Sequence, residues 1–292
     1  MQTASSTSIQ VAQRAGPASL HRLLIRDFRN FRELRLDLPE AGAMIIGPNG
    51  SGKTNLLEAI YYLEVFRSFR GARDSDLIRF GEDVFRIEAT IQRDEGTEEL
   101  AAAFQKTGRR KKVEREGAEV DRITGAIGAF GAVVFDLDDA GLVSGSPGRR
   151  RRFLDILLSL VVPGYVADLQ RYRAVLAQRN EALRAGRDEV VDAWTEGLIV
   201  PGAKLMAARD GWARRRADGF RGYHQQISGG AAASLEYETS FSATHEEVGW
   251  GKRFRSGLEA SRTRDFRRGF STVGPHRDVL AMRAGGVSDG PG

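Results

Sequence analysis

The stretch "GPNGSGKTNLLEAI" (residues 47–60), with the short apolar run "AMII" (43–46) directly before it, decides which fold we expect for this chain. Residues 47–54 match the pattern G-x-x-x-x-G-K-S/T at every fixed position. "AMII" has the length and composition of a buried parallel strand, and from Thr54 onward apolar residues recur at helical spacing. The sequence therefore predicts a glycine-rich loop between a buried strand and a helix, which is the setting that a P-loop requires.

The residue types in this loop fit the chemistry of binding a nucleotide phosphate. Gly47, Gly50 and Gly52 let the backbone turn closely around an anion, so that its N–H groups point at the phosphate oxygens. The helix beginning near Lys53 adds the positive end of its dipole, the Lys53 ammonium suits the β- and γ-phosphates, and the Thr54 hydroxyl is a magnesium ligand. A chance glycine turn is the alternative, but the expected strand and helix on either side favour a nucleotide site. The candidate site consists of Gly47, Pro48, Asn49, Gly50, Ser51, Gly52, Lys53 and Thr54.

A P-loop also needs a second acidic group, usually at the end of a buried strand, to hold the magnesium ion and its water. The run "AVVFD" (132–136) has that shape, so Asp136 is a candidate Walker B carboxylate. A buried strand followed by the acidic loop "DLDDAG" explains the same residues equally well. The pattern by itself leaves both interpretations open.

Composition is that of a globular protein with a basic balance. The chain has 292 residues, of which 41% are hydrophobic and 28% charged, with a net charge of +5 and a pI of about 9.7. This balance favours acidic partners such as nucleic acid. The absence of cysteine excludes a disulfide framework, a thiolate nucleophile and a cysteine-based zinc site. No stretch resembles a signal peptide or a membrane span, so we expect a cytoplasmic protein.

The first part of the chain is rich in expected strands. Apolar residues alternate on both sides of a break in "LHRLLIRDFRNFRELRLDL" (20–38), which predicts two strands joined by a tight turn. Further strands are expected at 84–92 and 98–105, and "GRRKKVEREG" (108–117) is expected to be a basic hairpin tip.

From Arg149 the pattern changes to helical spacing. We expect helices over 149–184, broken at Pro163 and Gly164, and over about 192–223, interrupted at Pro201 and Gly202, before strand alternation returns at 234–241. The predicted organisation is a disordered extension at 1–18, a strand-rich lobe with the P-loop at 19–135, a helical arm at 136–230, and a return to the first lobe at 231–292.

Several phrases are more specific than the P-loop. They are "IRDFRNFREL" (25–34), "RSFRGARDSDLIRFG" (67–81), "GSPGRRRRFLD" (145–155), "LQRYRAVLAQRN" (169–180) and "TVGPHRD" (272–278). In this order, and together with the P-loop, they resemble the RecF family of ABC/SMC-type ATPases over most of the chain. The resemblance implies an α/β fold, namely an ABC/SMC-type P-loop ATPase head with an inserted helical arm.

The resemblance also implies a function in DNA replication, recombinational repair and the SOS response. A family member would bind ATP and Mg²⁺, form an ATP-dependent homodimer, bind single- or double-stranded DNA at gaps, and act with RecO and RecR to load recombinase, with weak DNA-stimulated ATPase activity. Arg29 and Asn30 match the loop that lies beside the adenine and ribose. Asp136 does not match the family's magnesium carboxylate, because that Walker B strand comes much later. The alternative is a stand-alone P-loop NTPase, such as a kinase, that uses Asp136 as Walker B.

The family pattern continues after "VGPHRD" with a signature segment built on serine, glycine and glutamine, then a helix and the Walker B strand. The sequence "VLAMRAGGVSDGPG" (279–292) contains none of these. We therefore expect a truncated family member with an incomplete head, which hydrolyses ATP at no more than background and stays monomeric with ATP.

Four basic runs are candidate contacts to DNA phosphates, at 109–112, 149–152, 214–216 and 262–268. A solvated surface is the alternative for each, and the stems of 149–152 could instead pack at the base of the arm. His276 is the one histidine within a specific phrase, and either a structural hydrogen bond or a ligand contact is consistent with its position.

Overall fold

A computed structural model describes residues 18–129, 131–135, 139, 141–241 and 249–285. The chain divides into two compact units, Met1–Phe135 (unit 1) and Asp136–Gly292 (unit 2). The expected extension at 1–18 lies outside the described residues except for Ala18, and Asp136 also lies outside them.

Unit 1 is built on an antiparallel six-stranded sheet in the order β2-β1-β3-β4-β5-β6. Side chains alternate between its faces, so that Leu23 and Ile25 are buried while Arg22 and Arg26 are exposed on the opposite face. The strands predicted at 20–38, 84–92 and 98–105 are confirmed. The strands are β1 (Ser19–Phe28), β2 (Phe31–Asp37), β3 (Val84–Arg93), β4 (Gly96–Gln105), β5 (Arg110–Arg115) and β6 (Ala118–Glu119).

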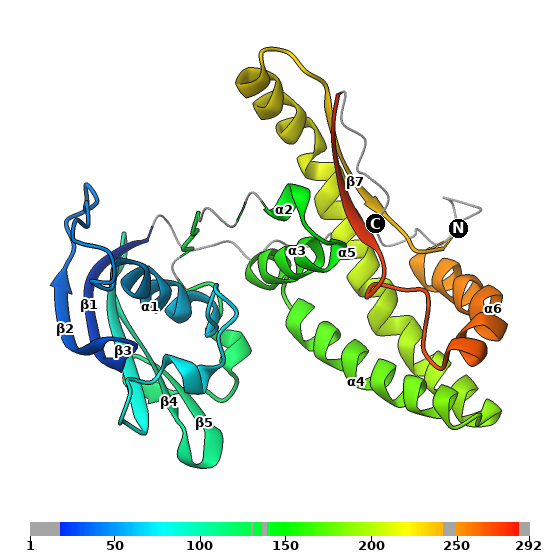
Figure 1. Ribbon diagram of the computed structural model, residues 1–292, viewed down its shortest axis with the longest axis horizontal. Helices are drawn as coiled ribbons and strands as arrows, with labels where there is room; N and C mark the ends of the chain where they lie inside the picture. The colour runs from blue at the N-terminus through cyan, green and yellow to red at the C-terminus, as the bar shows by residue number, and fades with distance from the viewer. Residues whose placement is uncertain (1–17, 130, 136–138, 140, 242–248, 286–292) are drawn as a thin grey trace, which may run out of the picture. The chain divides into compact units, whose positions relative to one another are not determined.

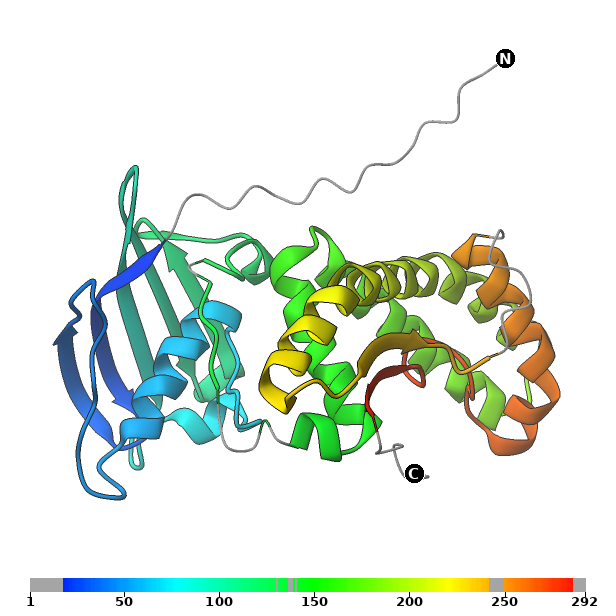
Figure 2. The same ribbon diagram turned by 90° about the horizontal axis from the view of Figure 1, so that it is seen from above.

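Helix α1 (Lys53–Val65) covers the buried face of this sheet, as Figures 1 and 2 show. The Tyr62 ring packs edge-on against Phe28 and Phe85 in the core between helix and sheet. The helix predicted after the P-loop is thus confirmed. Three short 3-10 turns complete the unit, at Asp74–Leu77, Thr107–Arg109 and Ile123–Gly125.

Three predictions for unit 1 were wrong. Residues 110–115 form strand β5 rather than a hairpin tip, because Val113 points into the core while Lys112 and Glu114 alternate to the other face. The runs "AMII" and "AVVF" form no strand and are not buried: Met44 and Ile46 are 85% and 84% exposed, and Phe135 is 88% exposed. A wholly apolar strand needs covering on both faces, and in the described residues of unit 1 no strand lies beside either run.

Unit 2 is mainly helical, with one antiparallel pair formed by β7 and β8. Figure 1 shows the long helix α5 running beside α4. The break predicted at Pro163 and Gly164 is confirmed, since Gly164 caps α4 with a φ of 79°. The elements are α2 (Gly141–Ser144), α3 (Pro147–Val161), α4 (Tyr165–Arg184), α5 (Asp188–Ser228), β7 (Ala233–Glu238), α6 (Trp250–Arg268) and β8 (Val279–Ala284).

The interruption predicted at Pro201 and Gly202 is absent, because α5 runs through both residues. Gly202 instead allows α6 to approach closely: a Cβ there would lie 2.4 Å from Phe254 Cε1. The sequence did not predict α6, whose buried Phe254 and Leu258 are separated by one turn within an otherwise polar segment. A buried ion pair between Arg179 Nη1 and Asp265 Oδ2 (2.9 Å) ties α4 to α6.

The division of unit 2 into an arm and a returning head segment remains a proposal. β7, α6 and β8 pack with α3, α4 and α5 in one core that includes Leu158, Leu205, Leu235, Phe254 and Leu280. No helix within the described ranges has the length and apolar character needed to cross a membrane.

Candidate functional site

The glycine-rich loop leads directly into the N-terminus of α1. Gly50 and Gly52 have φ angles of +81° and +104°, a region that disfavours side chains. Gly52 caps the helix without any side-chain hydrogen bond, and the first turn carries no acidic residue. The positive end of the α1 dipole and its free N–H groups are therefore available to an anion.

Gly52 also packs against the turn between β1 and β2. A Cβ at this position would lie 2.6 Å from Asn30 Nδ2 and 2.8 Å from Phe31 Cζ, closer than real Cβ contacts allow. A glycine is therefore needed at residue 52 both for its φ angle and for this contact.

Lys53 and Thr54 begin the helix and carry the two groups expected to meet a nucleotide. Lys53 Nζ donates to the carbonyl oxygens of Gly47 (2.7 Å) and Pro48 (2.8 Å), which holds the ammonium against the loop backbone. Thr54 is exposed, and its hydroxyl has no hydrogen-bond partner in the part of the chain that the structure describes. Both groups are thus positioned at the same helix end.

Asn30 fastens the loop to the β1–β2 turn. Its Nδ2 donates to the Ser51 carbonyl oxygen (3.2 Å), and its Oδ1 accepts from Asn55 Nδ2 (2.8 Å) on α1. Asn30 therefore lies beside the P-loop, as its predicted role requires, while its contact with a nucleotide stays a prediction.

Arg29 is engaged by protein groups on all three guanidinium nitrogens. Nε and Nη2 donate to the two carboxylate oxygens of Glu58 (2.9 and 3.0 Å), and Nη1 donates to the Asp76 carbonyl oxygen (3.0 Å). Glu58 is fully buried on α1. The predicted contact of Arg29 with adenine and ribose is not tested by this geometry. The geometry shows that the ion pair between Arg29 and Glu58, called the Arg29–Glu58 latch below, connects the β1–β2 turn to α1.

The sequence analysis did not identify Glu58 as a residue of this site, although Ser68 and Arg70 in the phrase at 67–81 both contact it. Ser68 Oγ donates to Glu58 Oε1, and Arg70 Nη1 lies 3.9 Å from Glu58 Oε2. The same Ser68 hydroxyl accepts the backbone N–H groups of Arg70 and Ala72. This part of the phrase "RSFRGARD" therefore helps to fix the buried carboxylate that holds Arg29.

The available donors fit a magnesium ion that is bound chiefly by phosphate and water. Mg²⁺ usually keeps several waters and takes few protein ligands, and Thr54 supplies one hydroxyl at the loop. Within the described residues no cluster of three or more His, Cys, Asp or Glu side chains could hold a metal ion.

Comparison with known proteins assigns the family. The family described as RecF/RecN/SMC N terminal domain matches residues 19–232. The DNA replication and repair protein RecF of Chlamydia muridarum is 35% identical over 265 residues, which are 90% of this chain and 72% of that protein. This chain belongs to the RecF family. The RecF of Streptococcus equi subsp. zooepidemicus strain H70 is also 35% identical, over 89% of this chain and 71% of the relative.

Solved structures of RecF share the fold of this chain. A structure of the recombination mediator protein RecF with ATPrS in the RecFOR pathway matches with a TM-score of 0.86 and 26% identity, over 93% of this chain and 75% of that one. The corresponding structure with ATP matches equally well, over 95% and 76%. The fold is therefore the RecF/SMC-type ATPase head, mixed α/β with helical segments, as the sequence predicted.

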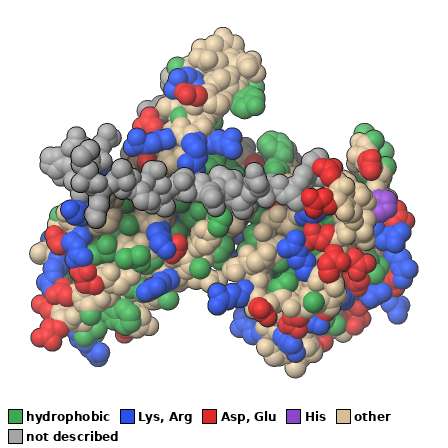
Figure 3. Space-filling model, turned by 180° about the vertical axis from the view of Figure 1, so that it is seen from behind, with side chains coloured by type: hydrophobic (Ala, Val, Ile, Leu, Met, Phe, Trp, Pro, Cys, Tyr) green, Lys and Arg blue, Asp and Glu red, His purple; other side chains and the backbone are tan. Residues whose placement is uncertain are grey.

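Some residues of the basic runs of this RecF chain form ion pairs with its own acids. In 109–112, Lys111 pairs with Asp74 and Lys112 with Glu114, and in 214–216 Arg214 pairs with Asp210. Figure 3 shows Lys and Arg side chains interspersed with Asp and Glu across the face in view.

The remaining runs are partly structural. Arg150 of α3 is buried and donates to the carbonyl oxygens of Val143, in α2, and Gly145, between α2 and α3. In 262–268, Arg262 bonds Asp192, and Asp265 is fully buried. The interpretation that stems of 149–152 pack locally therefore holds for Arg150.

His276 has a structural hydrogen bond on each ring nitrogen. Nδ1 lies 2.7 Å from Tyr172 Oη, and Nε2 lies 3.0 Å from the Ser271 carbonyl oxygen. Burial lowers the pKa of His276, so the ring is neutral, with Nε2–H donating to Ser271 and Nδ1 accepting from Tyr172. Of the two uses that the sequence left open, the structure shows the hydrogen-bonded one.

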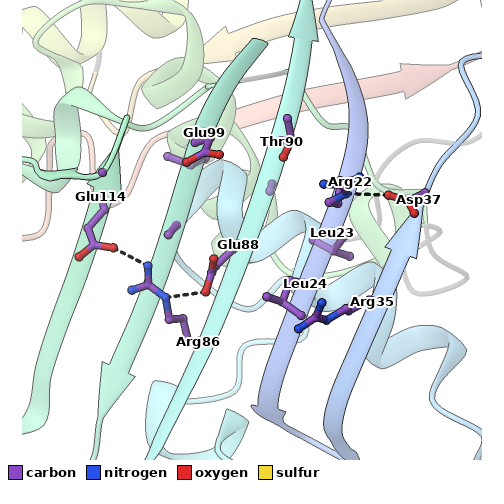
Figure 4. A pocket seen from close by; sticks show the side chains of 14 residues that line it. Arg22, Leu23, Leu24, Arg35, Asp37, Arg86, Glu88, Thr90, Glu99 and Glu114 are labelled. Atoms are coloured by element: carbon purple, nitrogen blue, oxygen red, sulfur yellow. Dashed lines mark hydrogen bonds and ion pairs between the residues drawn. The ribbon is translucent and has the colours of Figure 1, made fainter.

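A hollow of about 530 Å³ lies on the exposed face of the unit 1 sheet (Figure 4). Arg22 Nε pairs with Asp37 Oδ1 on the neighbouring strand β2 (2.7 Å), and Arg86 pairs with Glu88 on its own strand β3 and with Glu114 on β5. Because acids match its arginines, this face lacks the excess positive charge of a phosphate site. The loop at α1 remains the candidate nucleotide site.

Proposed function

We propose that this RecF-family chain binds ATP with Mg²⁺ at residues 47–54 and acts on DNA with RecO and RecR in recombinational repair and replication. The observation that carries the nucleotide site is the uncapped N-terminus of α1, where Lys53 Nζ and the Thr54 hydroxyl stand beside a left-handed glycine turn. The similar RecF structures, described as RecF with ATPrS or ATP in the RecFOR pathway, support the choice of ligand and partners.

Each residue of the loop has a defined part in this proposal. Backbone N–H groups of the loop and of the first turn of α1 point at the phosphate oxygens, as at other helix N-termini. Lys53 exchanges its bonds to Gly47 and Pro48 for the β- and γ-phosphates, and Thr54 ligates Mg²⁺. Asn30 and the Arg29–Glu58 latch hold the loop and α1 against the β1–β2 turn.

Contacts to DNA are proposed to be made to its phosphate backbone. The chain carries 44 Lys and Arg residues against 39 Asp and Glu residues, and exposed arginines such as Arg215 and Arg216 lie on α5. Binding of this kind weakens steeply with salt and varies little with base sequence. A flat salt response over mixed-sequence duplexes would contradict it.

The nucleotide site is tested by titrating a fluorescent ATP analogue with Mg²⁺ into wild type and Lys53→Ala. We expect the affinity to fall about tenfold or more, since a hydrogen bond to a charged group contributes about 1.5–3 kcal/mol. Lys204→Ala, which removes an exposed lysine of unit 2, is the matched control and should bind as wild type. Equal affinity of wild type and Lys53→Ala would remove the assignment.

A further inference from the structure

Three family-specific stretches that the P-loop does not use come together in unit 2. Arg151 and Arg152 of "GSPGRRRRFLD", Arg173 of "LQRYR" and the segment 275–276 of "GPHRD" line one hollow of about 190 Å³. Arg209, from the middle of α5, completes its wall. Four separate parts of the chain therefore deliver their side chains to one small cavity.

The charge of this hollow is unbalanced. Four arginines line it and only one carboxylate, that of Asp155. Asp155 is already shared, since Oδ1 accepts from Arg209 Nη2 (2.7 Å) and Tyr165 Oη (2.7 Å), while Oδ2 accepts from Arg173 Nη2 (3.1 Å). Among the described residues, the remaining two arginines of the lining form no ion pair with a carboxylate; Asp278 lies near Arg151, but its carboxylate accepts hydrogen bonds from Tyr237 and Ser240 instead.

Arg151 and Arg152 are those remaining arginines. Within the described ranges, Arg151 donates only to the backbone carbonyl oxygens of Arg277 (3.5 Å) and Asp278 (3.1 Å). Burial, and then the nearby guanidinium groups of Arg209 and Arg277, lower the pKa of Arg151, while Asp278 and Asp155 raise it in part. Arg152 is exposed and has no hydrogen-bond or ion-pair partner among the residues that the structure describes.

The backbone adds to the same positive field. Helix α3, of 15 residues, begins at Pro147 and has no side-chain cap on its N-terminus, and Gly148 in its first turn lines the hollow. His276 adds no charge, since both of its ring nitrogens are used and the ring is neutral. In the first turn of α3, Pro147 has no N–H and the Arg149 N–H donates to the Ser146 carbonyl oxygen (3.0 Å), which leaves the Gly148 N–H and the helix dipole to an anion. The hollow thus combines arginine forks with a helix N-terminus, both of which suit oxyanions.

We propose that this hollow binds a single phosphate group, held by Arg151, Arg152 and the first turn of α3 and backed by Arg209. Its volume of about 190 Å³ is below the 300 Å³ or more usual for sites that take a whole small molecule, so one phosphate fits better than a nucleotide. The source is either a phosphate of a DNA strand or a free phosphate. The inference does not depend on nucleotide binding at residues 47–54.

Tryptophan fluorescence gives a test that is confined to unit 2, because the three tryptophans, Trp194, Trp212 and Trp250, all lie there. Denaturant unfolding is followed in inorganic phosphate and in chloride of equal ionic strength. Phosphate should raise the unfolding midpoint in the wild type, since a ligand stabilises the state that binds it. Hydrogen exchange should show added protection in 145–155 and 271–279.

Arg152→Gln is the variant of choice because the side chain is exposed and unpaired, and Arg216→Gln, an exposed arginine of α5 outside the hollow, is its control. Phosphate affinity should fall about tenfold or more in Arg152→Gln and stay unchanged in Arg216→Gln. Arg152→Lys keeps the positive charge but loses the forked guanidinium, so its phosphate affinity should lie between those of the two glutamine variants. An equal effect of chloride, or equal weakening in both glutamine variants, would overturn the proposal.

The source is separated by competition with a short single strand of DNA bearing a 5′-phosphate or a 5′-hydroxyl. Displacement of phosphate by both strands assigns the site to backbone phosphates, and displacement only by the phosphorylated strand assigns it to a strand end. Phosphate binding without any displacement assigns it to free phosphate. If neither phosphate nor DNA changes exchange in 145–155, the hollow is not a phosphate site.

Discussion

Replacing Glu58 with glutamine tests the latch that positions the P-loop. Glu58 is fully buried and accepts two hydrogen bonds from Arg29, whose side chain is 22% exposed. Glutamine keeps the shape of the side chain but presents an amide N–H₂ to a guanidinium that has only donors. The change therefore removes one charge-assisted hydrogen bond and leaves Arg29 without its carboxylate.

The cost follows from these contacts. A hydrogen bond to a charged group contributes about 1.5–3 kcal/mol, and breaking a buried ion pair on one side costs about 3–5 kcal/mol. Because Arg29 retains some access to water, the destabilisation of unit 1 should lie in the upper part of the first range, at about 2–3 kcal/mol, and below the cost of a fully buried pair. Exchange of α1 amides that require unfolding of unit 1 should then be about 30- to 150-fold faster, at tenfold per 1.4 kcal/mol.

Hydrogen exchange of the peptide covering 53–65 measures this, and tryptophan fluorescence should stay unchanged because unit 1 contains no tryptophan. Glu88→Gln is the matched control: Glu88 also pairs with an arginine, Arg86, but both side chains are about one-third exposed. Such surface pairs contribute about 0–1 kcal/mol. If both variants accelerate exchange of α1 equally, the latch does not hold the helix.

Two further changes test particular residues. Gly52→Ala and Gly50→Ala both place a side chain at positive φ, which costs about 1–3 kcal/mol. Gly52→Ala should destabilise unit 1 more, because only the Cβ at residue 52 meets Asn30 and Phe31. Equal hydrogen-exchange rates of α1 in the two variants would contradict this. Burial lowers the pKa of His276 below its usual 6.5, with Arg277 and Arg151 lowering and Asp278 raising it. Its contribution to stability is therefore complete above pH 6.5 and is lost as the pH falls towards the folded-state value. The denaturant midpoint of unfolding, followed by tryptophan fluorescence, should fall as the pH is lowered from 7 to 5.5, and it should fall less in His276→Gln. The same dependence of the midpoint on pH in both proteins would refute this.

The P-loop, the first hairpin and helices α1, α3 and α4 follow from patterns that are local in the sequence. Gly52, Lys53 and Thr54 could be placed because a helix N-terminus and a glycine turn need only neighbouring residues. The exposure of "AMII" could not be predicted in the same way, since whether this run is buried depends on strands beside it rather than on its own composition.

Buried charges were the other part that local patterns did not reveal. Glu58 and Asp265 are buried because arginines from distant segments, Arg29 and Arg179, reach them across the fold. A charged residue in a helix predicts an exposed position unless its partner is known. The same polarity hid α6, where Asp265 lies on the buried face together with Phe254 and Leu258.

Hydrogen exchange of the wild-type chain with and without ATP and Mg²⁺ tests the central claim most directly. Binding at the proposed site should slow exchange in peptides covering 47–56, where the loop and the first turn of α1 offer their N–H groups to the phosphates. Protection there, lost in Lys53→Ala, is the predicted result. Saturating ATP that leaves 47–56 unprotected, while other segments respond, would contradict the assignment of this loop as the nucleotide site.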